Sequence, residues 1–492
     1  MGKIKTVGVI GGGVSGLAAG GLLSREGVKV KLFEASDKLG GCCANTILGG
    51  YTFNDGAGYL CLPGILDHVF EKLGLDRPSI LPLRKVKAHQ TILPNGTVVL
   101  LGGKSKLKVN QRLGEVDTVR LQKELRKLLN KWESVLRLYE DDLFVHPFLL
   151  SRLITKIWPH IHKLQGTVAS ELRKLFSDKA VQAAIAGSLL FITGAPPQKT
   201  PVPMILSPVA ILTEGFYLPE GGMGKIPEAL SQSLRKNGGE LFLNSKVNRI
   251  LLKNGIVHGL EIDRLGLIEL DAVVSTVSGM VTFGSLLKPE DLPHGMRQKV
   301  KKVPLSHKAL SIQLGLSNVL DGCSHSNSVL PMMNEQSTFF MFKEDEVKWF
   351  TYLVPTVTMP ELAPRIGSII EMFPAIRQDR PADDWDEQKT GRVVESGLQA
   401  LSGRHKINIA VKRVLSPKDF QNKMRLYKGA IYGLSGTADF RAQFPHAPGV
   451  PGLYQAGQTT YPGFGVGPAA MSGIFAAEAL LRTKKYVNII SP

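Results

Sequence analysis

The chain has 492 residues, of which 43% are hydrophobic and 21% charged, a composition typical of a packed globular protein. One hydrophobic core rarely supports a chain of this length, so two or three lobes are expected. The net charge of +18 suits nucleic acid, an anionic membrane surface or an acidic ligand. The sequence lacks zinc-ligand spacing and interleaved aromatic and basic residues, which argues against nucleic acid. No apolar run reaches the ~18 residues that span a bilayer, which leaves a membrane surface as the better partner.

The four cysteines, Cys42, Cys43, Cys61 and Cys323, form neither an even disulfide framework nor a metal-binding spacing. A reducing compartment is therefore expected, with no bound metal. A strand is predicted directly after the first five residues, which leaves no room for a signal peptide. The sequence thus predicts a cytoplasmic protein that attaches at most to the surface of a membrane.

The chain opens with a strand–helix–strand pattern. Val7–Ile10 is a short apolar run, a helix of small residues is predicted from about Ser15 to Arg25, and Val28–Glu34 alternates lysines with apolar residues. A helix between two strands is the crossover that a parallel sheet requires. The first part of the chain is therefore expected to begin an α/β domain.

Charged helices dominate the next part of the chain, the clearest being Thr118–Tyr139. The α/β pattern returns with a helix over Ile226–Asn237 and with buried strands at 240–243 and 271–275.

Two hairpins are predicted from Asn-Gly pairs. One pair lies at 95–96 between two short apolar runs, and the other at 254–255 separates Val247–Leu252 from Val257–Ile262.

A glycine-rich turn between the first strand and the first helix predicts a dinucleotide site. Gly11, Gly13 and Gly16 have the spacing that lets backbone approach a pyrophosphate and lets helix and strand pack closely. The phosphates then bind at the helix N-terminus, where unpaired N–H groups favour negative charge. Glu34 closes the second strand at the distance expected for a carboxylate that accepts hydrogen bonds from a ribose. The alternative, a glycine turn without a ligand, does not explain this combination.

Further glycines after Glu34 favour FAD over NAD. Leu39-Gly40-Gly41 and the run 50–58 suggest a second loop that closes over a longer cofactor. The chain contains one such fingerprint only, so no second NAD(P)H-binding domain is expected. The electron donor or acceptor must then be external.

At this point the sequence resembles a known family: the FAD-dependent oxidoreductases of the phytoene desaturase, carotenoid isomerase and retinol saturase group, relatives of the flavin amine oxidases. Besides the N-terminal motif, the resemblance rests on three separated blocks, at 217–224, 244–247 and 451–473. In that family the equivalent of Val247 contributes backbone contacts to the adenine. The last block predicts a strand that ends in glycine and a helix that starts near Pro468, whose N-terminal N–H groups face the flavin. The motifs and the resemblance together place these residues at the FAD site: Gly11, Gly13, Val14, Ser15, Gly16, Glu34, Ala35, Gly40, Gly41, Cys42, Gly56, Ala57, Gly58, Val247, Gly457, Gly467, Pro468, Ala469 and Met471.

The resemblance implies a Rossmann-like FAD-binding domain interleaved with a mixed α/β substrate domain. We expect the FAD-binding domain in residues 1–85, 218–287 and 414–492, and the substrate domain in residues 86–217 and 288–413.

Two departures from the family pattern bear on the site. Cys42 and Cys43 follow the paired glycines, where desaturases and amine oxidases usually have arginine, and this resembles the retinol saturase and isomerase branch more closely. Cys42 is either a small packed residue or a redox-active thiol, of which packing is the better explanation. No cysteine lies in the C-terminal block, so FAD is expected to be noncovalent.

The stretch 144–164 is predicted to be an amphipathic helix. Leu150, Leu153, Ile154, Ile157 and Ile161 fall at helical spacing on one face, with basic residues beside it. Such a helix suits a membrane surface, with its cations against anionic headgroups, and it suits packing on its own lobe about equally well. The net charge, together with the resemblance to a family that handles long apolar polyenes, tips the expectation slightly towards the membrane.

The expected function is hydride transfer between flavin N5 and C–C or C=C bonds of a hydrophobic substrate such as a polyene. Desaturation, saturation and cis–trans isomerisation all use this scaffold. Two alternatives remain: an amine oxidase acting on C–N bonds, for which an aromatic pair facing the flavin is expected, and an FAD-binding partner protein without turnover. No histidine or carboxylate is assigned a catalytic role from the sequence.

Overall fold

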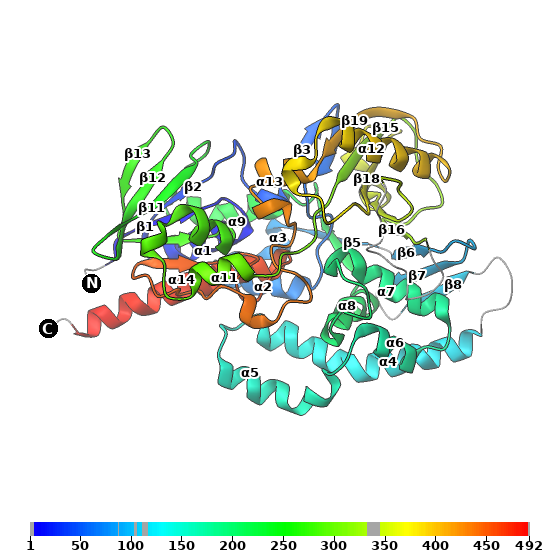
Figure 1. The fold of residues 1–492 in the computed structure, drawn as a ribbon, viewed down its shortest axis with the longest axis horizontal. Helices are drawn as coiled ribbons and strands as arrows, with labels where there is room; N and C mark the ends of the chain where they lie inside the picture. The colour runs from blue at the N-terminus through cyan, green and yellow to red at the C-terminus, as the bar shows by residue number, and fades with distance from the viewer. Residues whose placement is uncertain (1–3, 87, 103–105, 111–116, 332–344, 491–492) are drawn as a thin grey trace.

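The computed structural model describes residues 4–86, 88–102, 106–110, 117–331 and 345–490. It has two lobes with both termini on the same side, and the C-terminal helix α14 projects from the first lobe (Figure 1).

A five-stranded parallel sheet forms the core of the first lobe, in the order β10-β2-β1-β14-β20. Its strands come from three distant parts of the chain: β1 Thr6–Ile10, β2 Lys29–Phe33, β10 Glu240–Phe242, β14 Ala272–Ser275 and β20 Leu453–Gln455. The predicted opening of strand, helix and strand is confirmed, because β1 and β2 pair in parallel with Val9 opposite Leu32.

Alternation along β1 separates the two faces of this sheet. Val7 and Val9 pack on the helices α1 Val14–Arg25, α2 Pro63–Lys72, α9 Lys225–Lys236 and α14 Val466–Ile490. Ile10 packs in a different cluster, with Leu260 and Leu453. That second face is covered by an antiparallel sheet of β11 Val247–Lys253, β12 Ile256–Ile262 and β13 Gly266–Glu269. The hairpin predicted at 254–255 connects β11 and β12 and is confirmed.

The second lobe contains an eight-stranded sheet in the order β19-β15-β18-β17-β16-β6-β7-β8. Its strands are β6 His89–Ile92, β7 Val98–Gly102, β8 Lys106–Asn110, β15 Ser311–Leu316, β16 Ser326–Val329, β17 Phe350–Leu353, β18 Ser368–Pro374 and β19 Ile409–Leu415. The hairpin predicted at 95–96 is confirmed, because β6 and β7 pair antiparallel. The helix α12 Glu387–Ser402 packs on one face of this sheet through Val393 and Leu401.

Because side chains alternate along each strand, the opposite face of the large sheet does not pack under α12. In β17, Phe350 and Tyr352 point into the core under α12, whereas Thr351 and Leu353 line a cavity between the lobes. Phe373 of β18 also faces that cavity. One sheet thus provides both a hydrophobic core and one wall of the cavity.

The helices of residues 118–213 lie in the lower part of Figure 1, and several of their side chains line the cavity. They are α4 Thr118–Leu138, α5 Leu150–Ile157, α6 Val168–Leu175, α7 Lys179–Thr193 and α8 Leu206–Thr213. Trp132 of α4 is fully buried, and its indole N–H donates to Glu171 of α6 over 2.9 Å.

Several smaller elements complete the fold. They are two strand pairs, β3 Asn45–Leu48 with β4 Tyr51–Asn54 and β5 Leu83–Val86 with β9 Phe216–Pro219, and the short helices α3 Arg77–Ile80, α10 Gly279–Val281, α11 Met296–Lys302 and α13 Pro417–Asn422.

The prediction of one helix over 144–164 is wrong. Residues 144–149 are not helical, α5 covers Leu150–Ile157, and a 3-10 helix follows over Trp158–Lys163. Pro159 lacks the N–H that a continued α-helix would require of it, which explains the change at this point.

Candidate active site

A cavity of about 1270 Å³ lies between the two lobes. Pockets for a single ligand usually measure roughly 300–1,000 Å³, so this cavity has room for a dinucleotide and a second molecule. One end is formed by the glycine turns at the carboxyl ends of β1 and β2, and the rest by the large sheet and by the helices of residues 118–213.

The glycine turn after β1 builds an anion site at one end of the cavity. Gly11 has a φ of 102°, which favours glycine, and a Cβ on Gly13 would meet nothing within 4 Å, so backbone is open to the cavity here. A Cβ on Gly16 would lie 1.9 Å from the carbonyl oxygen of Gly11, so only glycine permits this turn. The N-terminus of α1 therefore presents its free N–H groups and positive dipole end to the cavity.

Ser15 adds a polar group without a protein partner. Its hydroxyl is buried, lines the cavity, and makes no hydrogen bond within the described part of the chain. A buried hydroxyl without a partner is costly, and a phosphate oxygen at the α1 N-terminus would satisfy it.

Glu34 is held rigidly at the end of β2. One carboxylate oxygen accepts from the backbone N–H of Gly12 over 2.6 Å, and the other accepts from the backbone N–H and the hydroxyl of Ser36, both over 2.8 Å. The carboxylate faces the cavity beside the phosphate site. This arrangement fits the ribose of an adenine dinucleotide, and it would repel a 2′-phosphate.

The C-terminal block brings a second helix N-terminus to the cavity. Gly457, Gly463 and Gly465 all have φ above 100°, so the chain can turn sharply between β20 and α14. Pro468 and Ala469, in the first turn of α14, line the cavity. The dipole of α14 would favour negative charge on a ligand at this point, such as that of a reduced flavin.

Most of the residues predicted to bind the cofactor line this one cavity: Gly11, Gly13, Val14, Ser15, Glu34, Ala35, Gly40, Gly41, Cys42, Gly56, Ala57, Gly58, Val247, Gly457, Pro468 and Ala469. Gly16, Gly467 and Met471 lie outside the lining. Gly16 contacts the turn backbone, a Cβ on Gly467 would lie 3.2 Å from Ile65, and Met471 is fully buried in the core. Direct contacts of these residues with FAD stay a prediction.

The thiols of the cavity wall are poor nucleophiles. Burial raises the pKa of Cys42 to about 11 and that of Cys61 to about 12, and it raises the pKa of Cys43 further. A thiol reacts as its thiolate, which is scarce near neutral pH at such pKa values. These properties favour the packing role expected for Cys42.

The wall beyond the glycine turns is largely apolar. Its residues include Leu136, Tyr139, Leu143, Phe144, Ile192, Met204, Leu206 and Ala210.

Two aromatic residues of the cavity wall, Tyr432 and Phe464, pack on each other. Their ring centroids lie 4.9 Å apart at a tilt of 41°. Other aromatic residues of the wall include Tyr59, Phe144 and Tyr461, so the aromatic pair facing the flavin that is expected of an amine oxidase stays a prediction.

A polar cluster that sequence reasoning missed lies where the large sheet meets the loop after β4. Arg413 of β19 donates to Asp55 and to Gln313, each over 2.7 Å, and Lys38 donates to the other oxygen of Asp55 over 2.7 Å. Asp55 and Arg413 both line the cavity. Asp55 lies in the run 50–58 noted above, but Gln313 and Arg413 are distant in sequence and belong to no motif, so only the sheet topology brings them to it.

Glu371 is buried behind this cluster. It accepts from the backbone N–H of Asn54 over 2.6 Å, and a Cβ on Gly58, which lines the cavity, would lie 4.0 Å from its carboxylate. Burial raises the pKa of Glu371 to about 8, against the opposing effect of the hydrogen bonds from Asn54.

No described group of three or more His, Cys, Asp and Glu side chains is arranged to hold a metal ion.

The chain belongs to the family described as flavin containing amine oxidoreductase, whose model it matches over residues 14–481. It is 24% identical to a zeta-carotene-forming phytoene desaturase of Myxococcus xanthus, and the match covers 96% of this chain and 93% of that protein. It is 26% identical to a neurosporene-forming phytoene desaturase of Rhodobacter capsulatus, with the same coverage of 96% and 93%.

Solved structures agree on the fold. An oxidoreductase of Methanosarcina mazei matches with a TM-score of 0.64 at 18% identity, covering 96% of this chain and all of that one. A putrescine oxidase variant matches with a TM-score of 0.63 at 14% identity, covering 97% and 99%.

The protein is therefore an FAD-dependent oxidoreductase, and the Rossmann-like α/β fold expected from the sequence is confirmed. When bound, FAD supplies a ring that accepts or donates a hydride. The described residues would hold its phosphates at Gly11–Ser15 and its ribose at Glu34, and the largely apolar wall would exclude water from the ring.

Replacing Ser15 by alanine should weaken FAD binding about tenfold, the effect of losing one hydrogen bond to a charged group. The stability of the apoprotein should not fall, because the hydroxyl has no protein partner to lose. Titration of the apoprotein with FAD, followed by flavin fluorescence, measures the first effect, and thermal unfolding measures the second.

Ser24→Ala is the matched control for this test. Ser24 is buried in the same helix, but its hydroxyl donates to the carbonyl of Gly21 over 3.1 Å. The Ser24→Ala variant should leave FAD affinity unchanged and should lower the stability of the apoprotein slightly, because it loses this hydrogen bond. Equal FAD affinities for Ser15→Ala and the wild type would remove Ser15 from the phosphate site.

Stability should depend on pH through Glu371. In the unfolded chain its carboxyl loses the proton near its ordinary pKa of about 4.5, whereas the folded protein keeps the proton until about pH 8. The folded state therefore holds one more proton between these values, and the free energy of unfolding falls as the pH rises through them. Glu371→Gln removes this dependence, so its stability relative to the wild type should improve by up to ~1.4 kcal/mol per pH unit. Urea unfolding of the apoprotein at about pH 5.5, 7 and 8.5 measures the difference. Parallel stability curves would contradict a raised pKa.

Proposed function

We propose that this FAD-dependent oxidoreductase transfers a hydride between flavin and C–C or C=C bonds of a long, apolar, polyene-like substrate. The observation that carries the proposal is the apolar wall, which continues from the region of the glycine turns to exposed aromatic residues at the surface, Phe148 and Phe440. The curated relatives reported above are phytoene desaturases by name, and they match over almost the whole chain.

The ionisable groups of the cavity support chemistry that needs little acid–base catalysis. Asp55 is held by two cations, Asp439 is paired with Arg441, and burial raises the pKa of Tyr432 and Tyr461. Hydride transfer to or from an unactivated carbon depends mainly on orientation and on a dry site, which an apolar wall provides.

Anaerobic titration of the FAD-loaded protein tests the proposal. A polyene such as phytoene, delivered in detergent micelles, should bleach the flavin absorbance if the enzyme desaturates. Reoxidation of chemically reduced flavin by a conjugated polyene would indicate saturation, which uses the same bonds in the opposite direction. Bleaching by an amine such as putrescine, with no response to polyenes, would replace the proposal by amine oxidation. A flavin that responds to none of these compounds would indicate a binding protein without turnover.

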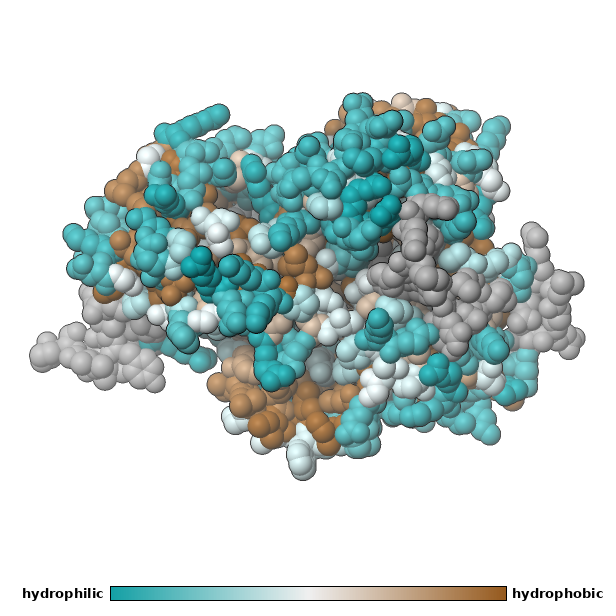
Figure 2. Space-filling view, viewed as in Figure 1, coloured by the Kyte–Doolittle hydropathy of each residue, from teal (hydrophilic) through white to brown (hydrophobic). Residues whose placement is uncertain are grey.

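We further propose that the protein takes this substrate from an anionic membrane surface. Support comes from a surface that we call the apolar patch, formed by Phe148, Leu149, Leu150, Ile154, Trp158, Ile161 and Phe440, each between 37% and 70% exposed. Figure 2 shows a brown area at the position of α5. Exposed apolar patches of this kind commonly mark membrane or protein contacts, and basic residues lie beside this one on the same helix. No helix among the described residues is long and apolar enough to cross a bilayer.

Replacing Ile154 and Trp158 together by glutamate should reduce binding to vesicles containing phosphatidylglycerol by about tenfold or more, because apolar contact is lost and negative charge is added. Co-sedimentation with vesicles measures the bound fraction. Ile366→Glu is the matched control, since Ile366 is 69% exposed but lies outside the apolar patch. Similar losses in both variants would show that the patch has no special role.

A further inference from the structure

The segment that carries the apolar patch also forms the mouth of the cavity. Leu153 and Ile157 of α5 point into the cavity, whereas Ile154 and Trp158 point to solvent. None of the side chains of α5 or of the 3-10 helix after it is fully buried. An eight-residue helix with so little buried surface is weakly held by packing, and its position depends on the few polar contacts that fix it.

The ion pairs of α5 converge on one carboxylate, and Phe148 just before the helix also packs on Tyr461, with ring centroids 5.3 Å apart. Asp142, in the π-helical turn Tyr139–Leu143, accepts from Arg152 over 2.8 Å with one oxygen and from Lys156 over 3.1 Å with the other. Hydrogen bonds from Arg152 and Lys156 hold the pKa of Asp142 down to about 2, so the carboxylate is ionised at neutral pH. Arg152 and Lys156 lie one turn apart on α5, and both are partly exposed.

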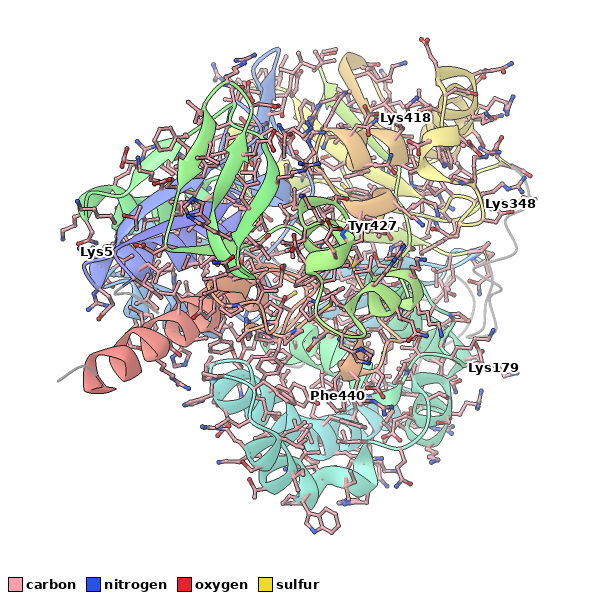
Figure 3. All side chains as sticks on the ribbon, turned by 60° about the vertical axis from the view of Figure 1, so that its left-hand side comes forward. Lys5, Lys179, Lys348, Lys418, Tyr427 and Phe440 are labelled. Atoms are coloured by element: carbon pink, nitrogen blue, oxygen red, sulfur yellow. The ribbon has the colours of Figure 1, made fainter. Side chains whose placement is uncertain are left out.

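The mouth itself lies where this segment meets the C-terminal chain. Phe148 and Phe440 both line the cavity and are both exposed, and their ring centroids are 6.0 Å apart. Phe440, labelled in Figure 3, lies close to the helices of residues 118–213. Movement of α5 away from the body would separate these two rings and widen the opening.

We propose that Asp142, Arg152 and Lys156 form a latch, and that the phosphate groups of an anionic lipid surface open it by replacing the Asp142 carboxylate at Arg152 and Lys156. The inference rests on the proposed membrane association and adds a coupling to it: the surface that binds the protein also opens its cavity. Both cations are already at the surface, beside apolar side chains that would enter the lipid. A partly exposed ion pair is weak in water, so a dense layer of phosphates can compete with it.

The chain is held in place by buried residues on both sides of α5, so that α5 can move between two fixed ends. Leu143 and Val145 are buried before the segment, and Val168 is buried after it. Lys163 donates to the carbonyl of Lys131 of α4 over 3.1 Å and fixes the far end. Between these anchors the latch is the main charged contact that holds α5 over the mouth.

The gap between Phe148 and Phe440 can be measured directly. In a double variant, Phe148→Trp with Phe440→Cys labelled with bimane, the tryptophan quenches the fluorophore while the mouth is closed. Protein labelled without the Phe440→Cys change corrects for reaction of the native thiols. The full FAD-loaded chain is mixed with vesicles of phosphatidylcholine alone or with added phosphatidylglycerol, and co-sedimentation reports binding separately.

Bimane emission should rise at least about twofold with phosphatidylglycerol and stay near its starting value with phosphatidylcholine alone, as expected for a population shift towards the open mouth. Asp142→Asn, added to the reporter, should give the high emission without vesicles and a small further change with them. Asp379→Asn is the matched control, because it removes the carboxylate of another Arg–Asp pair, Arg377–Asp379, outside the cavity wall. It should behave like the unmodified reporter.

Two outcomes would overturn the latch, and they differ in what else they imply. If the vesicles bind but emission does not rise, and Asp142→Asn stays quenched, the ion pair is only structural and membrane association stands. If no vesicle binds, the proposed membrane association fails and the latch fails with it.

Discussion

The close approach of two helices from opposite ends of the chain is the constraint on which the site depends. A Cβ on Gly473 of α14 would lie 2.0 Å from the carbonyl oxygen of Ser15 in α1, so these helices pack backbone to backbone. Their N-termini then open onto the same cavity, one beside Gly13 and the other beside Pro468. A larger residue at the crossing would separate two positive helix ends that must face one ligand. Glycine is therefore needed in the helix interior as much as in the turns.

The large sheet has two faces in different surroundings: one face packs in a hydrophobic core, and the other must remain open to a ligand. Alternation along β17 and β18 does this without extra chain, since Tyr352 and Met372 pack under α12 while Leu353 and Phe373 face the cavity. A charged residue on the cavity face, such as Arg413 of β19, then needs a partner of opposite charge close to the sheet, and Asp55 in the loop after β4 is that partner. Asp55 meets this need by accepting from Arg413 and Lys38, which balance its charge at the wall.

Short-range patterns in the sequence are sufficient to predict the helices, strands and turns around the nucleotide site. The turn at Gly11–Gly16, the helix after it and both Asn-Gly hairpins follow from short-range chemistry and are present as predicted. Arg413 and Glu371 could not be found in this way, because they reach the site through strand register and alternation in a sheet assembled from distant segments. The stretch 144–164 failed for another reason: its helical spacing was real over α5, but Pro159 and the non-helical residues before Leu150 interrupt it. The predicted single apolar face is divided, with Leu153 turned to the cavity and Ile154 to solvent. The domain boundaries stay a prediction.

The energies involved explain why such a segment can be both ordered and releasable. A partly exposed ion pair contributes only ~0–1 kcal/mol, and each cation near an anionic bilayer gains about 1 kcal/mol, so exchanging the carboxylate of Asp142 for lipid phosphate is nearly balanced. The transfer of the apolar side chains into lipid therefore determines whether the closed or the open position of α5 is favoured. Leu150, Ile154 and Trp158 are each more than half exposed, and their transfer into lipid gains roughly 25 cal/mol for each Å² removed from water. In water the hydration of the separated charges offsets most of the loss of the ion pair, and the small remaining advantage favours α5 over the mouth. At a membrane both terms act on the same short helix, and access to the cavity becomes linked to the place where an apolar substrate is found.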